Sequence, residues 1–119
     1  MTERLTTELT AIGADVNEGL GICMNMESLY KKLLEMFVRD TNFALMQAAI
    51  EEGDCPKAYE HAHALKGVTA NIGFRHLLEP LTRIMQEMKE GHIGQVKGQL
   101  LPLVERYNDT CRVIRTNLP

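Results

Sequence analysis

The stretch that decides the fold is Glu60–Gly73, EHAHALKGVTANIG, because two opposed patterns overlap in it. On a helix at about 100° per residue, the apolar residues of this stretch and of the turn before it form one narrow, core-facing stripe. The members of the stripe are Ala58, Ala62, Leu65, Thr69 and Ile72. His63 points about 140° away from the centre of the stripe. We therefore expect a helix that buries the stripe and exposes His63 to water.

Three more residues share the outer surface of this helix with His63, at positions i+3, i+4 and i+7: Lys66, Gly67 and Ala70. A glycine inside an exposed helix costs about 1 kcal/mol relative to alanine and has no local structural use there. Its missing side chain would instead let a partner approach His63 closely. Lys66 is available to attract an anion at the imidazole ring.

The run 62–73, AHALKGVTANIG, resembles the signature of histidine-containing phosphotransfer (HPt) domains, which is A-H-x-L-K-G followed by a glycine ten residues after the histidine. The segments 15–20 and 27–37 also resemble that family's entry segment and first long helix, so the resemblance spans most of the chain. It implies a phosphorelay intermediate, in which His63 accepts a phosphoryl group from an aspartate of one receiver domain and passes it to an aspartate of another. Lys66, one turn away, would offset the charge of about -2 that phosphorylation adds.

The partners implied are receiver domains of response regulators or of a hybrid sensor histidine kinase. The sequence contains no G-x-x-x-x-G-K-[ST] nucleotide loop and no carboxylate cluster for Mg²⁺. We therefore expect a phosphocarrier rather than an enzyme, with no cofactor of its own and with Mg²⁺ supplied by the receiver domain. Neutral imidazole is a competent nucleophile near neutral pH, because its unperturbed pKa is about 6.5.

Composition limits the remaining possibilities. A chain of 119 residues fits a single domain, 1–119, and 45% hydrophobic residues with no Trp predict an aliphatic core. The net charge of -3 argues against nucleic-acid binding. Three widely spaced cysteines support neither a disulfide framework nor a thiolate zinc site. Without a long apolar run or a signal peptide, we expect a cytoplasmic protein that does not bind membranes.

Helical periodicity predicts an all-α fold, an up-down antiparallel four-helix bundle with short additional N-terminal helices. The expected elements are a helix over 2–12, a turn capped by Asp15, one long helix from a cap at Asn25 to Gly53, the signature helix capped by Asp54 and ended by Gly73, and two further helices separated by Gly91. In the long helix the apolar pattern continues through 40–42, so one helix, bent at most, is favoured over two. Pro80 and Pro102 should kink the last two helices or shift their starts.

The predicted docking surface for a receiver comprises His63, Lys66, Gly67 and Ala70, with Tyr59 and Phe74 as apolar contacts at its margins. His61 is interpreted as a packed, hydrogen-bonded residue at the edge of the core, and His76 and His92 as surface residues without carboxylates around them. No metal site is expected, because His61 and His63 diverge by about 200° and cannot chelate one ion. Most methionines are expected to fill the core.

Two other classes of function remain open. A non-catalytic helical module could use the same surface to bind or sequester a receiver domain without any phosphoryl transfer. A histidine kinase dimerisation domain is disfavoured, because no ATP-binding segment follows the histidine motif. We expect a monomer, because there is one histidine motif and no long heptad seam is left unpaired.

Overall fold

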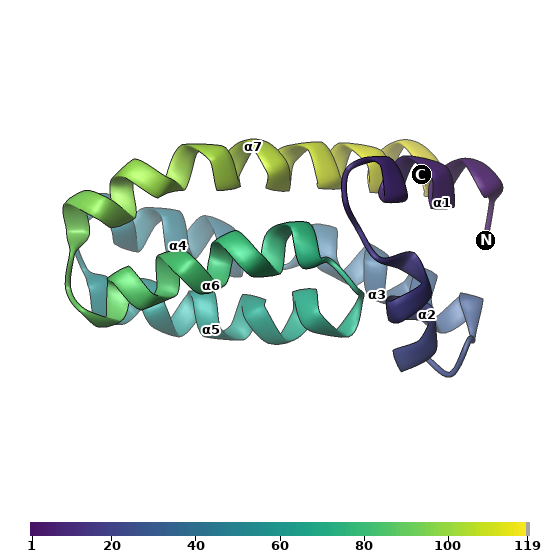
Figure 1. Cartoon of the computed structure of the whole chain (residues 1–119), viewed down its shortest axis with the longest axis horizontal. Helices are drawn as coiled ribbons and strands as arrows, with labels where there is room; N and C mark the ends of the chain where they lie inside the picture. The colour runs from purple at the N-terminus through teal and green to yellow at the C-terminus, as the bar shows by residue number, and fades with distance from the viewer. Residues whose placement is uncertain (119) are drawn as a thin grey trace.

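The computed structural model describes residues 1–118, which form helices joined by short turns, with no strand among them (Figure 1). The helices are α1 (Glu3–Ala11), α2 (Val16–Ile22), α3 (Glu27–Arg39), α4 (Asn42–Glu51), α5 (Cys55–Asn71), α6 (Arg75–Lys89) and α7 (Ile93–Asn117). None of these helices is both long and apolar enough to cross a lipid bilayer.

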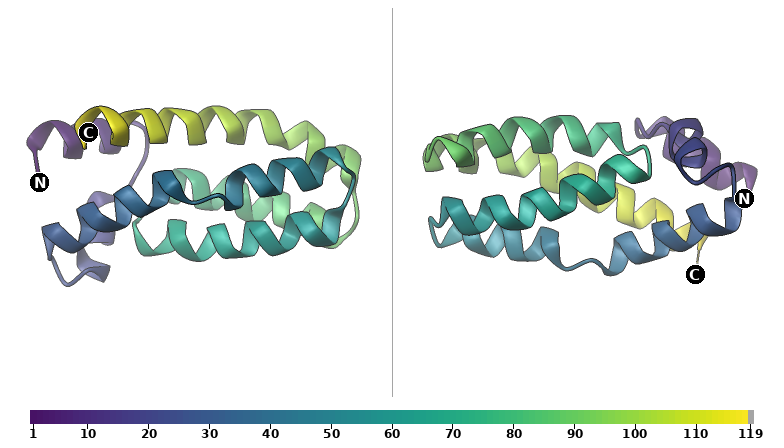
Figure 2. Two further views of the ribbon diagram at one scale, coloured as in Figure 1. Left: turned by 180° about the vertical axis from the view of Figure 1, so that it is seen from behind. Right: turned by 90° about the horizontal axis from the view of Figure 1, so that it is seen from below.

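Four antiparallel arms make up the body of the molecule, as Figures 1 and 2 show. Helices α3 and α4 follow one another along the first arm, and α5, α6 and α7 are the other three. Helix α1 packs beside the C-terminal part of α7, and α2 lies at the same end of the bundle. The predicted up-down four-helix bundle with short N-terminal helices is therefore confirmed.

The prediction of one long helix over 25–53 is wrong, because the chain breaks between α3 and α4 (Figure 2, left). Asp40 has extended backbone angles, φ -67° and ψ 129°. Its carboxylate accepts hydrogen bonds from the backbone N–H of Asn42 at 2.7 Å and from the Asn42 side chain at 2.9 Å. Such side chain to backbone bonds compete with the helical pattern and start a new helix. Helix α3 also begins later than expected, since Met26 is its N-cap and Asn25, the predicted cap, has a positive φ of 58°.

The break turns a different face of α4 toward the core from the one that the apolar pattern predicted. The apolar pattern predicted that Ala44, Leu45 and Ala48 would face the core, but all three are exposed. The buried residues of α4 are Phe43, Met46, Ala49 and Ile50. The ring of Phe43 stacks on that of Tyr107 in α7, with centroids 3.8 Å apart. If α3 continued without a break, Phe43 would lie off the core-facing stripe and could not stack on Tyr107.

Helix α5 forms as the sequence predicts. The Asp54 carboxylate accepts a hydrogen bond from the backbone N–H of Lys57 at 3.1 Å, and Pro56 lies in the first turn, where no N–H is needed. All five residues of the predicted stripe are buried. At the other end, Gly73 adopts a left-handed φ of 72° and terminates the helix.

Gly73 also brings the α1–α2 turn against the end of α5. Its carbonyl accepts a hydrogen bond from the Asp15 N–H at 2.7 Å. A Cβ atom at Gly73 would lie only 2.1 Å from the Asp15 carbonyl oxygen. Nearby, the buried Tyr30 hydroxyl donates to the Ile72 carbonyl at 2.8 Å. These contacts tie α2 and α3 to the C-terminal end of α5 and so fix the helix that carries His63.

Candidate functional site

The outer surface of α5 is arranged as its sequence pattern predicts. His63, Lys66 and Gly67 are exposed, and Ala70 is half-buried. They lie on the side of the helix opposite the buried stripe, which packs among α4, α6 and the rest of the core. The imidazole is therefore accessible to a second protein.

The His63 ring lies beside one aromatic neighbour. Tyr59, one turn earlier and half-buried, places its ring nearly parallel to the imidazole, with centroids 6.2 Å apart and planes 14° apart. Within residues 1–118, neither ring nitrogen of His63 takes part in a hydrogen bond or ion pair. Both nitrogens are thus available for chemistry.

Lys66 lies at a small hollow of about 110 Å³ between α5 and α6. Tyr59 lines the same hollow from α5, and Gln86 and Lys89 line it from α6. Neither Lys66 nor Lys89 forms an ion pair with another residue in 1–118. The two cations give this side of α5 a positive character that suits an anion. Sequence reasoning missed Lys89, because only the antiparallel packing of α6 on α5 brings it near Lys66.

Gly67 faces open space, since a Cβ atom built there meets nothing within 4 Å. The fold therefore does not need a glycine at this position. The helix loses about 1 kcal/mol relative to alanine without any gain in packing.

The prediction that Phe74 is a surface contact is wrong, because the side chain is fully buried. After the turn at Gly73, Phe74 enters the core and packs edge-on against Phe37, with ring centroids 5.2 Å apart. The helical phase of α5 does not continue past Gly73, so position 74 could not be assigned to the outer surface by extending it.

A different apolar surface lies on the other flank of α5. Exposed large side chains extend from α2 along α3, and they are Ile22, Met24, Met26, Leu29 and Met36. Next to them, a groove of about 360 Å³ runs between α3 and α5, lined by Leu33 and Met36 on one side and Val68 and Asn71 on the other. We call this the α3–α5 groove. Met46, Met85 and Met88 fill the core as predicted, whereas Met24, Met26 and Met36 do not.

The other histidines divide between confirmed and wrong predictions. His61 is half-buried and its Nδ1 lies 3.1 Å from Asn42 Oδ1, as expected for a packed boundary residue. His76 is buried instead of exposed. His92 is exposed as predicted, but the prediction that no carboxylates surround it is wrong, because its Nδ1 lies 2.9 Å from a Glu87 oxygen and 3.3 Å from a Glu90 oxygen. The left-handed turn at Gly91 returns the chain over the end of α6 and brings these groups together.

Comparison with known proteins agrees with this geometry. The sequence model of one family, described as the Hpt domain, matches residues 32–110. That range contains most of the bundle and the whole of α5. No curated protein and no solved structure matched the chain in the two other comparisons. Because the match covers more than half of the chain and includes the exposed histidine, this protein belongs to the Hpt domain family.

Proposed function

We propose that His63 is the residue through which this Hpt domain carries a phosphoryl group between the aspartates of two receiver domains. Membership of the family establishes a role in histidine phosphotransfer within a phosphorelay, and Hpt domains interact with receiver domains. The observation that carries the assignment to His63 is its exposed ring, which has no hydrogen-bond partner in residues 1–118 and projects from the α5 surface beside Gly67.

The transfer is a nucleophilic displacement at phosphorus. A lone pair on an imidazole nitrogen of His63 attacks the phosphorus of an aspartyl phosphate, the P–N bond forms, and the P–O bond to the aspartate breaks to release a carboxylate. The reverse sequence donates the group to the next aspartate. The receiver domain supplies the Mg²⁺ and the electrophilic groups that stabilise the transferring phosphoryl oxygens.

Lys66 and Lys89 support this step through their charge. A phosphoryl group on His63 brings a charge of about -2. Ion pairs at exposed positions contribute about 0.2–1 kcal/mol each, so the lysines adjust the stability of phospho-His63 and do not create its reactivity. Both lysines line the hollow that Tyr59 also lines, and the ring of Tyr59 lies beside the imidazole of His63.

The surface around His63 fits a receiver domain as the partner. The missing side chain at Gly67 lets a facing backbone approach within reach of the imidazole. The α3–α5 groove and the exposed methionines beside it add apolar contact area, as in the core of protein interfaces. These contacts replace Phe74, which is unavailable because it is buried.

The test mixes the full chain with a receiver domain that carries a labelled phosphoryl group, and measures how much of that label the chain acquires. We expect an acid-labile, base-stable phosphoryl group on the wild type and none on His63→Gln. His61→Gln is the matched control, because His61 lies on the same helix but is half-buried. Label on His63→Gln, or equal loss of label in both variants, would exclude His63 as the acceptor.

Clearance at Gly67 has its own test. Gly67→Leu should retain the fold and slow transfer strongly, because the added side chain occupies the space that the receiver needs. Gly94→Leu is the control, since Gly94 is also helical and open but lies in α7. Loss of folding in Gly67→Leu would contradict the clearance argument.

Two outcomes distinguish the other functions. If the protein only sequesters a receiver domain, the His63→Gln variant should bind that domain as well as the wild type does, and the signalling output should stay unchanged. A kinase dimerisation domain would acquire label from ATP without any partner.

A further inference from the structure

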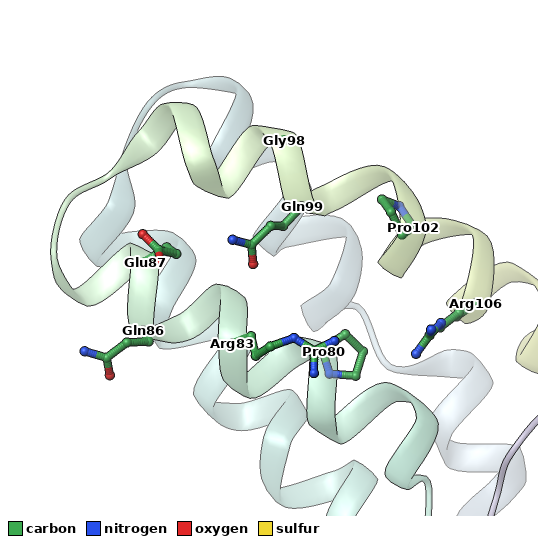
Figure 3. Close-up of a pocket in the computed structure, with 8 residues that line it drawn as sticks. All are labelled: Pro80, Arg83, Gln86, Glu87, Gly98, Gln99, Pro102 and Arg106. Carbon is green, nitrogen blue, oxygen red and sulfur yellow. The ribbon is translucent and has the colours of Figure 1, made fainter.

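A second hollow lies between α6 and α7 (Figure 3), and of its lining residues only Gln86 also lines the hollow that contains Lys66. Its volume is about 500 Å³, within the range of small-molecule sites. Pro80, Arg83 and the carboxylate-bearing Glu87 line it from α6, and Gln99, Pro102 and Arg106 line it from α7. We call it the α6–α7 groove. The predicted docking surface on α5 does not include any of these residues.

Neither Arg83 nor Arg106 forms an ion pair within residues 1–118, although the Glu87 carboxylate also lines the α6–α7 groove. Arg83 would ordinarily pair with Glu87 at i+4, but no such ion pair forms. Glu87 instead accepts from His92 at the end of α6, at 2.9 Å. Figure 3 shows Arg83 directed along α6 toward Pro80, and Arg106 pointing into the same hollow from α7. Because both guanidinium groups line one hollow, an anion bound there would be attracted by both charges.

Pro80 leaves a backbone carbonyl of α6 free to accept a hydrogen bond from Arg106. A proline in a helix interior has no N–H for the carbonyl four residues earlier, which here belongs to His76. The Arg106 guanidinium donates to that carbonyl instead, at 3.1 Å. One side of the guanidinium is thereby fixed to α6, and its remaining donors stay open to the groove. An anchored group of this kind loses less entropy when it binds a ligand.

We propose that the α6–α7 groove binds the oxyanion of a small molecule, a phosphate or carboxylate group, between the guanidinium groups of Arg83 and Arg106. Guanidinium is the side chain best suited to paired hydrogen bonds with either oxyanion. The amide of Gln99, which also lines the groove, can supply a neutral donor. Pro102 cannot donate to the Gly98 carbonyl, so the groove also offers an acceptor to a hydroxyl group on the ligand.

The test uses NMR of the full chain labelled with ¹⁵N, without any receiver domain. Sodium phosphate and sodium malonate are titrated separately, with sodium chloride at matched ionic strength as the reference. We expect saturable shifts of the Arg83 and Arg106 Nε–H signals with phosphate, malonate or both. The Arg112 signal, whose guanidinium pairs with Asp109 at 2.7 Å, should not follow them.

Variants separate the site from general charge effects. Arg83→Gln should weaken binding about tenfold, the usual effect of losing one charged hydrogen-bonding partner. Lys97→Gln removes an exposed cation from α7 outside the groove and should leave binding unchanged. Arg106→Lys keeps the charge but loses the planar guanidinium group. It should weaken binding while the helical circular dichroism signal persists.

Two results would overturn the proposal. One is a set of shifts that chloride reproduces or that never saturates. The other is equal weakening by Arg83→Gln and Lys97→Gln. Because Arg83 lies apart from the α5 surface, Arg83→Gln should still acquire label on His63 from a phosphorylated receiver. The experiments therefore test the anion site and the phosphotransfer function independently of each other.

Discussion

His63 and His76 show how one residue type serves two purposes in adjacent parts of this fold. His63 stands on the outer surface of α5, with no hydrogen-bond partner in residues 1–118. His76 lies in the first turn of α6 and is 9% exposed. Its ring packs at an angle against Phe74, and its Nε2 lies 2.8 Å from the Thr110 hydroxyl oxygen of α7. The first histidine is accessible for chemistry, whereas the second joins two helices.

The hydrogen bonds around His76 define its protonation state. The Thr110 hydroxyl donates its single hydrogen to the Arg106 carbonyl at 2.7 Å, so it must accept from Nε2–H of His76. Nδ1 then carries a lone pair and has no partner among the described residues. Burial, and secondarily the positive charge of Arg106, lower the pKa of His76 to about 4. A proton on Nδ1 would have no acceptor there, so the neutral ring is the form that fits.

The largest contrast should come from the same substitution at the two histidines. His63→Gln should abolish phosphoryl labelling and leave the free energy of unfolding unchanged. His76→Gln should still be labelled when folded, but should lose about 1–3 kcal/mol of stability because a buried hydrogen bond is disturbed. Labelling and urea unfolding of both variants check this. Equal stability losses would show that the two sites differ less than their burial indicates.

The second prediction concerns the turn that positions His76 and Phe74. Gly73→Ala should lower the free energy of unfolding by about 3–4 kcal/mol, because Gly73 has a left-handed φ and an added Cβ would meet the Asp15 carbonyl. Thermal or urea unfolding measures the loss. A change below about 1 kcal/mol would mean that the α1–α2 turn can move away from α5 at little cost.

The third prediction is a pH dependence of stability that arises from His76. Its pKa of about 4 in the folded protein lies below the value of about 6.5 for an unfolded chain, so the unfolded state binds the proton more readily. Stability should therefore fall as the pH drops from about 6.5 to about 4, by up to roughly 3 kcal/mol at 1.36 kcal/mol per pKa unit. Urea unfolding across this range measures the slope, which His76→Gln should reduce and His63→Gln should preserve.

The smallest expected effect is at the second glycine of this region. Gly67→Ala should raise the free energy of unfolding by about 0.5–1 kcal/mol, because alanine is the better helix former and the site is open. Compared with Gly73→Ala, the same change should thus have the opposite sign. Loss of stability at Gly67 would reveal a packing role that the open space around it does not show.

Local patterns predicted α5 almost completely. The cap at Asp54, the proline in the first turn, the buried stripe and the left-handed glycine each depend on neighbours within a few residues. The family signature lies in the same segment, so the exposure of His63 followed directly. The long-helix prediction failed because the Asp40 side chain competes for a backbone N–H, and the apolar pattern does not register this competition.

The sequence by itself determined the helical class, the family, the helix that carries the histidine and the side of it that faces water, because helical periodicity and capping are local properties. Only the tertiary structure decided that His76 and Phe74 are buried, that Lys89 comes near Lys66, and that Arg83 and Arg106 share one groove. Each of these depends on how separate helices pack against one another. No spacing along a single helix encodes that arrangement.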